Sequence, residues 1–189
     1  MQTLAANILP GVDRVVELGI ADAARIGVAG FSYGGYTAAA LLAQTTRFRA
    51  AMVTGGVYDL WRLYGDLDAG GNSEGAAIAE RYAGALPWTN LRSYIENNPI
   101  FCVERMTTPL LIIHGARDSV SVTQADALFV ALRARGKTVE YARYPDEFHS
   151  FVNVANQSDS LRRFVAWFDK YLQPPLRDTT EAENKKEAR

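Results

Sequence analysis

Short apolar runs alternate with longer amphipathic segments along most of the chain, and this alternation predicts strands that alternate with helices. The apolar runs at residues 25–31, 50–53, 110–114 and 139–144 predict four strands. The third run follows Pro109 and is almost entirely apolar, which is typical of a strand that is buried on both faces. Strands that alternate with helices predict one parallel sheet with right-handed crossovers and helices on both faces.

Four other segments carry apolar residues at helical spacing and predict the main helices. Residues 10–18 predict a short helix with its proline in the first turn, and residues 36–44 predict a second helix. Ser121 and Gln124 match a capping box, which predicts the start of a third helix that ends near Gly136. The apolar face of a last helix, which ends near residue 172, is expected to consist of Leu161, Phe164, Val165, Phe168, Tyr171 and Leu172.

The remaining segments set the expected boundaries of the domain. Periodicity is weak at residues 57–108, where glycines and tryptophans interrupt the pattern, so we expect loops and short helices that shape a surface. Prolines at 174 and 175 would end the last helix, and residues 177–189 are charged and include no aromatic or large aliphatic side chain. We therefore expect one partial domain over residues 1–173 and a disordered tail over residues 174–189.

Composition excludes several classes of function. The 20 lysines and arginines nearly balance the 21 aspartates and glutamates, and a net charge of -1 is poorly suited to holding nucleic acid. One cysteine and two histidines cannot assemble a disulfide or a structural zinc site, so we expect no metal and no cofactor. The absence of a long apolar run and of a basic leader segment predicts a cytoplasmic protein without a membrane partner.

A nucleophile motif lies where the first predicted strand meets the second predicted helix. Residues 30–34 read G-F-S-Y-G, which matches G-x-S-x-G at a junction between strand and helix. At such a junction the backbone turns sharply and projects the serine Oγ above the sheet. We therefore predict that Ser32 is a nucleophile and that Gly30 and Gly34 relieve crowding around it. The backbone N–H of Tyr33 begins the helix and is the expected donor to a developing oxyanion.

A serine nucleophile needs a base and an orienting carboxylate, which in this fold follow it along the chain in the order acid, then histidine. His149 lies in the loop after the last strand and is the expected base, whereas His114, at the end of a strand, is expected to be structural. Asp118 lies in the loop after the neighbouring strand and is the expected acid. Asp146 and Glu147 are alternatives for that acid, although they lie very close to His149 in the sequence.

Motifs along residues 5–172 resemble the catalytic domain of the prolyl oligopeptidase family of serine peptidases. The run Ser-Tyr-Gly-Gly-Tyr at residues 32–36 is more specific than the G-x-S-x-G pattern alone and favours a peptidase over a general esterase. The other matching stretches are residues 11–13, 19–22, 25–28, 81–82, 86–88 and 109–115, Asp118, and residues 144–145 ahead of His149.

The resemblance implies an α/β-hydrolase fold in which Ser32, Asp118 and His149 form a triad that hydrolyses short peptides through an acyl-enzyme. Members of the family include prolyl oligopeptidases, dipeptidyl peptidases and acylaminoacyl peptidases, and residues 64–65 and 86–88 favour the last two groups. By the same resemblance, the pocket for the residue before the scissile bond is formed by Tyr33, Val57, Trp61 and Tyr64. Ordinary loop packing is the alternative explanation for these aromatic residues.

The chain departs from the family at its front. A complete α/β-hydrolase domain has more strands than the four predicted here, so we expect the carboxyl-terminal half of the fold, in a fragment truncated on its amino-terminal side. The missing half would carry the second oxyanion donor and, in the family, a β-propeller that screens substrates by size. The strand at residues 25–31 would then be an exposed edge that pairs with a separate amino-terminal half.

Three hypotheses for the function follow. The first is a serine peptidase that acts on peptide substrates, and the second is an esterase of the same fold. The third is a catalytically impaired fragment that needs its missing half. Turnover of amides against esters separates the first two hypotheses, and the small number of predicted strands motivates the third.

Overall fold

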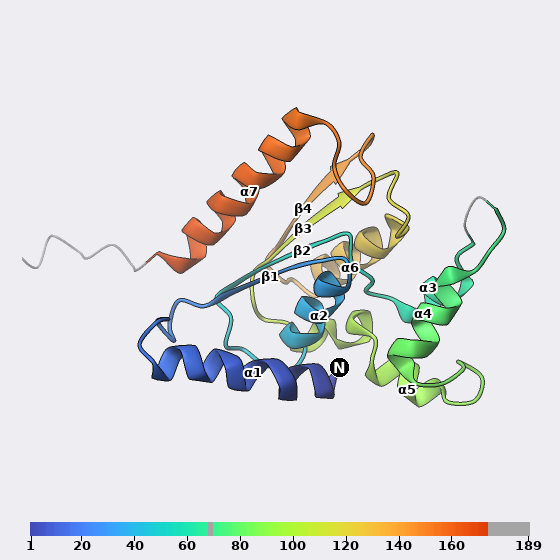
Figure 1. Ribbon diagram of the computed structural model, residues 1–189, viewed down its shortest axis with the longest axis horizontal. Helices are drawn as coiled ribbons and strands as arrows, with labels where there is room; N and C mark the ends of the chain where they lie inside the picture. Colours follow the sequence, from blue (N-terminus) through green and yellow to red (C-terminus); the bar gives the residue numbers. More distant parts are fainter. Residues whose placement is uncertain (68–69, 174–189) are drawn as a thin grey trace, which may run out of the picture.

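Four parallel strands form the centre of the molecule, which a computed structural model describes at residues 1–67 and 70–173 (Figure 1). The strands lie in the order β1-β2-β3-β4, and every neighbouring pair is parallel. Their bounds are Gly27–Phe31 for β1, Ala50–Thr54 for β2, Leu110–Gly115 for β3 and Val139–Tyr144 for β4. The predicted four-stranded parallel sheet is therefore confirmed. The predicted tail at residues 174–189 lies outside the described residues.

Side chains that alternate along the strands divide the core into two layers. The β2 and β3 residues in the first layer are Ala51, Val53, Leu110 and Ile112. Those in the second layer are Ala50, Leu111 and Ile113. Every residue of β3 is buried, as its apolar run predicts. β1 begins at Gly27, later than predicted, because the side chain of Arg25 remains exposed and pairs with Asp22 at 2.7 Å.

One face of the sheet is covered by α2 (Tyr33–Leu42) and α6 (Thr123–Ala134). Helix α1 (Gln2–Glu17) packs on α2, and the 3-10 helix η1 (Pro99–Arg105) packs on α6 and α2. The helix predicted at residues 10–18 is too short, since α1 begins at Gln2 and contains Pro10 in its interior. Packing explains this difference, because Ala5, Ile8 and Leu9 contact the core and offset the backbone hydrogen bond that the proline lacks.

The start of α6 differs from the predicted capping box. Its N-cap residue is Val122, which makes no side-chain cap bond. The buried side chain of Gln124 instead accepts hydrogen bonds from the backbone N–H groups of Tyr58 at 2.9 Å and Asp59 at 2.8 Å. It also donates one to the Asp59 carbonyl at 3.1 Å. The amide therefore ties α6 to the segment after β2, a long-range role that local spacing in the sequence does not reveal.

Three short helices lie between β2 and β3, where the sequence predicts loops and short helices. They are α3 (Leu60–Gly65), α4 (Glu74–Ala83) and α5 (Leu91–Glu96). Each begins after a polar side chain that accepts a hydrogen bond from the first turn, namely Asp59, Ser73 and Asn90. These helices lie beyond one end of the sheet (Figure 1). Their apolar residues form a separate buried cluster with Tyr36 of α2.

Helix α7 (Val154–Leu172) covers the other face and packs on β2 and β3 (Figure 1). Trp167 is the residue that it buries most deeply. The predicted apolar face is buried only in part, since Leu161 is 61% exposed and Val165 is 48% exposed. Among the described residues, no helix has the length and the apolar character needed to cross a lipid bilayer.

Candidate active site

Ser32 lies at the sharp turn between β1 and α2. Its backbone has φ 57° and ψ -119°, and it is the one non-glycine residue with positive φ in the part of the chain that the structure describes. Hydrogen bonds hold this conformation, because the Ser32 N–H donates to the Thr54 carbonyl at 2.9 Å and the Ser32 carbonyl accepts from Gly35 N–H at 2.9 Å. Strained backbone conformations of this kind occur mostly at active sites and ligand-binding sites, where surrounding contacts hold them in place.

The glycines around Ser32 contribute unequally to this turn. A Cβ at Gly30 would lie 1.9 Å from the carbonyl oxygen of Gly34, so no larger residue fits there. A Cβ at Gly34 would meet nothing within 4 Å, so the prediction that this glycine relieves crowding is wrong. Gly35 has that role instead, because its Cβ would lie 3.1 Å from the carbonyl oxygen of Thr54.

Three side chains from separate strand ends are joined by hydrogen bonds. The Ser32 Oγ lies 3.0 Å from His149 Nε2, and His149 Nδ1 lies 2.8 and 3.0 Å from the two carboxylate oxygens of Asp118. These residues follow β1, β4 and β3, so the parallel sheet brings them to the same edge. The partners assign the imidazole tautomer in which Nδ1–H donates to Asp118 and Nε2 accepts from the Ser32 hydroxyl.

Asp118 is the buried member of this group. Its side chain is 1% exposed, whereas that of His149 is 30% exposed. Besides His149, the Val120 N–H donates to the carboxylate at 2.7 Å, and His114 Nε2 lies 3.3 Å from it. Burial alone would raise the pKa of Asp118, but hydrogen bonds from His114, His149 and Val120 outweigh burial and lower that pKa. Asp118 is therefore ionised at neutral pH.

The other histidine and the two alternative acids lie elsewhere. His114 is fully buried, and its Nε2 lies 2.9 Å from the Val120 carbonyl, so its ring braces the loop that carries Asp118. Asp146 is exposed, and the Glu147 carboxylate accepts hydrogen bonds from the backbone N–H groups of Val152 and Asn153, just before α7. The structure therefore brings Asp118, rather than either alternative, to the imidazole. Among the described residues, no three His, Cys, Asp or Glu side chains gather as a metal ion would require.

Gly55 is a residue of the site that sequence reasoning missed. It follows β2, has φ +54°, and lies so close to the imidazole that a Cβ there would be 3.2 Å from both His149 Nδ1 and Asp118 Oδ2. Its N–H donates to the Ile113 carbonyl at 3.3 Å. In the sequence, Gly55 carries only the signal of a residue that ends a strand, because its neighbours come from distant parts of the chain.

Tyr33 opens α2 directly after Ser32, so its backbone N–H is one of the first four that have no acceptor within the helix. This position agrees with its expected use as an oxyanion donor. The Tyr33 side chain is 51% exposed, and its ring lies against those of Tyr36 and Tyr82, with centroid separations of 6.0 and 5.1 Å.

The three remaining residues of the predicted substrate pocket lie on and just before α3. Val57 is buried in the same apolar cluster as Tyr36, and Tyr64 packs against that cluster. Trp61 is 48% exposed. The rings of Trp61 and Tyr64 lie 6.4 and 5.2 Å from that of Trp88, measured between centroids. The structure thus gathers these aromatic residues with one another, and their role as a substrate pocket stays a prediction.

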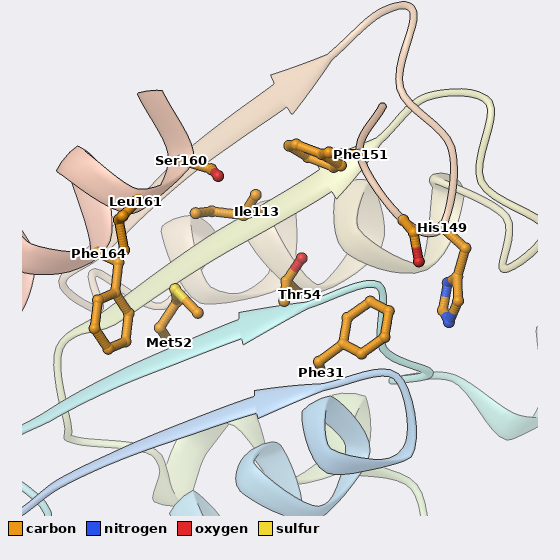
Figure 2. A pocket seen from close by; sticks show the side chains of 10 residues that line it. Phe31, Met52, Thr54, Ile113, His149, Phe151, Ser160, Leu161 and Phe164 are labelled. Carbon is orange, nitrogen blue, oxygen red and sulfur yellow. The ribbon is translucent and has the colours of Figure 1, made fainter. Parts of the chain in front are cut away.

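A groove of about 450 Å³ runs between the sheet and α7 and ends at His149. Figure 2 shows the rings of Phe31 and His149 at one end of the groove and Phe164 at the other. The Phe31 ring lies 4.6 Å from the imidazole, measured between centroids, and Phe31 is 47% exposed. The groove is mainly apolar, and none of the predicted pocket residues lines it.

Comparisons with known proteins place the chain among peptidases. A family model described as "Prolyl oligopeptidase family" matches residues 2–175. An uncharacterized peptidase, YuxL, of Bacillus subtilis is 28% identical over 155 residues, which are 80% of this chain and 23% of that protein. An acylamino-acid-releasing enzyme 2 of Oryza sativa is 28% identical over 180 residues, which are 92% of this chain and 23% of that protein.

The solved structure of a puromycin-hydrolyzing peptidase of Mycobacterium tuberculosis is similar in both fold and sequence. It matches with a TM-score of 0.78 and 28% identity, over 87% of this chain and 24% of that chain. The chain therefore spans about a quarter of the length of the relatives that it matches, at 23% to 24%.

Proposed function

We propose that this chain, which belongs to the prolyl oligopeptidase family, carries the hydrolytic centre of a serine peptidase with an α/β-hydrolase fold. In this proposal Ser32 is the nucleophile, His149 is the general base and Asp118 is the orienting carboxylate. The observation that carries it is the continuous hydrogen-bonded connection from Ser32 Oγ through the imidazole to Asp118, with separations of 3.0 and 2.8 Å.

The reaction begins when the imidazole of His149 takes the hydroxyl proton of Ser32 at Nε2, while Oγ attacks the carbonyl carbon of the scissile amide. The imidazolium that forms is stabilised by Asp118, whose lowered pKa keeps it ionised. His149 next gives its proton to the leaving amine, and an ester of the acyl group remains on Ser32. A water molecule that gives its proton to the same imidazole then hydrolyses this ester and restores the hydroxyl.

Negative charge on the tetrahedral intermediate needs donors that point at it, and the backbone N–H of Tyr33 supplies one of them. A helix begins at this residue, so the partial positive charge of the helix terminus favours an anion at the same place. A second donor would come from a segment outside this chain. Without it, turnover would fall by about 10²- to 10³-fold, the usual cost of losing one oxyanion donor.

The proposed substrates are short peptides. The exposed rings of Tyr33 and Trp61 and the half-buried ring of Tyr64 would take the side chain before the scissile bond. The name of the Oryza relative adds acylated amino-terminal residues to the candidate substrates, and that of the Mycobacterium structure adds puromycin, which also contains an amide bond to an amino acid.

A partner is proposed for the free edge of β1. In the part of the chain that the structure describes, β1 pairs only with β2, and Phe31 at its end is 47% exposed. An apolar parallel edge with unpaired N–H and C=O groups favours pairing with another strand. The proposed partner is a strand from a separate amino-terminal half of the domain. We expect the 189-residue chain alone to associate in solution, and light scattering at a monomer mass would contradict this.

The proposed chemistry is tested with a fluorophosphonate probe, which phosphonylates an activated serine. Parent chain, Ser32→Ala and His149→Ala would be labelled in parallel, and the modified residue would be located by peptide mass mapping. We expect label on Ser32 in the parent, none on this peptide in Ser32→Ala, and a strongly reduced rate in His149→Ala. Equal labelling in all three would contradict the triad. Paired amide and ester substrates with the same acyl group then separate peptidase from esterase activity.

A further inference from the structure

The loop that carries His149 has no regular secondary structure of its own. It connects the end of β4 at Tyr144 to the start of α7 at Val154, and its residues form neither helix nor strand. Yet the imidazole must keep Nε2 within 3.0 Å of Ser32 and Nδ1 within 2.8 Å of Asp118. Loops of this kind are mobile unless other groups hold them, so the contacts that fix this loop are part of the site.

The backbone on the β4 side of the loop is fixed by β3. The Glu147 carbonyl accepts a hydrogen bond from Arg117 N–H at 2.9 Å. A Cβ at Gly115, the last residue of β3, would lie 2.4 Å from the same carbonyl oxygen, so the two backbones are in close contact. The Arg117 guanidinium also lies over the Phe148 ring, 4.6 Å from its centroid. These contacts hold the residues before His149 but not those after it.

The residues after His149 are held by the side chain of Glu147, which is 0% exposed. One carboxylate oxygen accepts from Val152 N–H at 2.7 Å, and the other accepts from Asn153 N–H at 3.1 Å and from Asn156 Nδ2 at 2.7 Å. Burial alone would raise the pKa of Glu147, but these three donors outweigh it and lower the pKa. A charged carboxylate with three donors makes stronger hydrogen bonds than a neutral acceptor would.

We propose that Glu147 is a positioning residue, whose carboxylate closes the loop between residues 147 and 153 and so holds the His149 imidazole on Ser32 and Asp118. This inference rests on the proposed function, because a fixed imidazole has value only if His149 is the base. Glu147 acts through the loop and does not touch the reacting atoms. The Glu147 carboxylate faces its three donors near the start of α7, so Asp118 is the carboxylate that contacts the imidazole.

The central variant is Glu147→Gln, which keeps the size of the side chain. The new amide would place an N–H group against at least one backbone N–H donor, so it cannot accept all three hydrogen bonds. Glu140→Gln is the matched control, because Glu140 is an exposed glutamate on β4 that lies 3.7 Å from Lys170. Asn156→Ala is a milder second variant, since it removes one donor and leaves the two backbone donors in place.

Two measurements by NMR decide the inference on the full 189-residue chain. The first is amide hydrogen exchange at Val152 and Asn153, and the second is solvent exchange of the Nδ1 proton of His149. We expect Glu147→Gln to accelerate both by about tenfold, as loss of a hydrogen bond to a charged group does, and Asn156→Ala to accelerate both less. Glu140→Gln should leave both unchanged.

A third measurement, the rate of fluorophosphonate labelling at Ser32, separates this inference from the proposed function. Unchanged exchange at Val152 and Asn153 in Glu147→Gln would overturn the loop closure. Faster exchange there with an unchanged Nδ1 proton would overturn the positioning role. A parent chain that labels Ser32 no faster than any other serine would contradict the proposed function, while the two exchange measurements would still decide what Glu147 does.

Discussion

Replacing Gly55 with alanine tests whether the His149–Asp118 pair depends on the close approach of the end of β2. Gly55 has φ +54°, and a Cβ there would lie 3.2 Å from both Asp118 Oδ2 and His149 Nδ1. Contacts this short require the neighbours to move by a few tenths of an ångström. Gly136 offers a matched control, because it has φ +64° and its Cβ would meet nothing within 4 Å.

The magnitude follows from separating the backbone effect from the contact. Both Gly55→Ala and Gly136→Ala place a side chain on a left-handed residue, which lowers the free energy of unfolding by about 1–2 kcal/mol. Only Gly55→Ala also displaces the imidazole. A misplacement of about 1 Å in a reacting group costs about 10²-fold in rate, so a shift of a few tenths of an ångström corresponds to roughly tenfold.

The assay pairs urea denaturation with the rate of fluorophosphonate labelling at Ser32, followed by mass spectrometry under excess probe. We expect the two variants to lose similar stability, while only Gly55→Ala is labelled about tenfold more slowly than the parent. Equal labelling rates for Gly55→Ala and Gly136→Ala would refute the reasoning, because they would show that the contact with His149 and Asp118 does not set the position of the imidazole.

Three further predictions concern the same site. Asp118→Asn should slow Ser32 labelling by about 10⁴-fold, because a neutral amide leaves His149 in the wrong tautomer and cannot stabilise its imidazolium; an unchanged rate would contradict Asp118 as the acid. Gly30→Ala should lower the free energy of unfolding by about 3 kcal/mol or more and Gly34→Ala should not lower it, and equal urea midpoints would contradict this. Because the pKa of Asp118 is lowered, its contribution to stability is present above the ordinary value of about 3.9 and is lost as pH falls through the folded-state value. The urea midpoint of the parent should therefore fall more steeply below about pH 4 than that of Asp118→Asn, and parallel curves would oppose this.

The sheet could be predicted from the sequence because each strand corresponds to a short, continuous apolar run. Four apolar runs separated by helical segments leave little choice but a parallel sheet, and residues that follow the carboxyl ends of its strands then meet at one edge. This is why Ser32, Asp118 and His149, which are far apart in the sequence, could be chosen together before their separations were known. Their roles in catalysis stay a proposal.

The parts that could not be predicted depend on contacts between distant residues. Gln124 looks like half of a capping box, yet its amide oxygen accepts hydrogen bonds from the backbone N–H groups of Tyr58 and Asp59. Glu147 looks like a rival acid for His149, but three donors near the start of α7 hold its carboxylate. Pro10 looks like a helix start, and tertiary packing overrides that local preference. In each case a neighbour that local spacing does not reveal decides the outcome.

The positive φ of Ser32 lowers the stability of the fold, while the position of its hydroxyl serves the proposed chemistry. Stability and activity therefore favour different residues at this one position. A residue with φ 57° and a Cβ makes the fold less stable than glycine would, by about 1–3 kcal/mol. Selection for greater stability would therefore favour glycine at this position, and a requirement for the serine hydroxyl opposes that change. If hydrolysis ceased to matter to the organism, position 32 is where we would expect this sequence to change first.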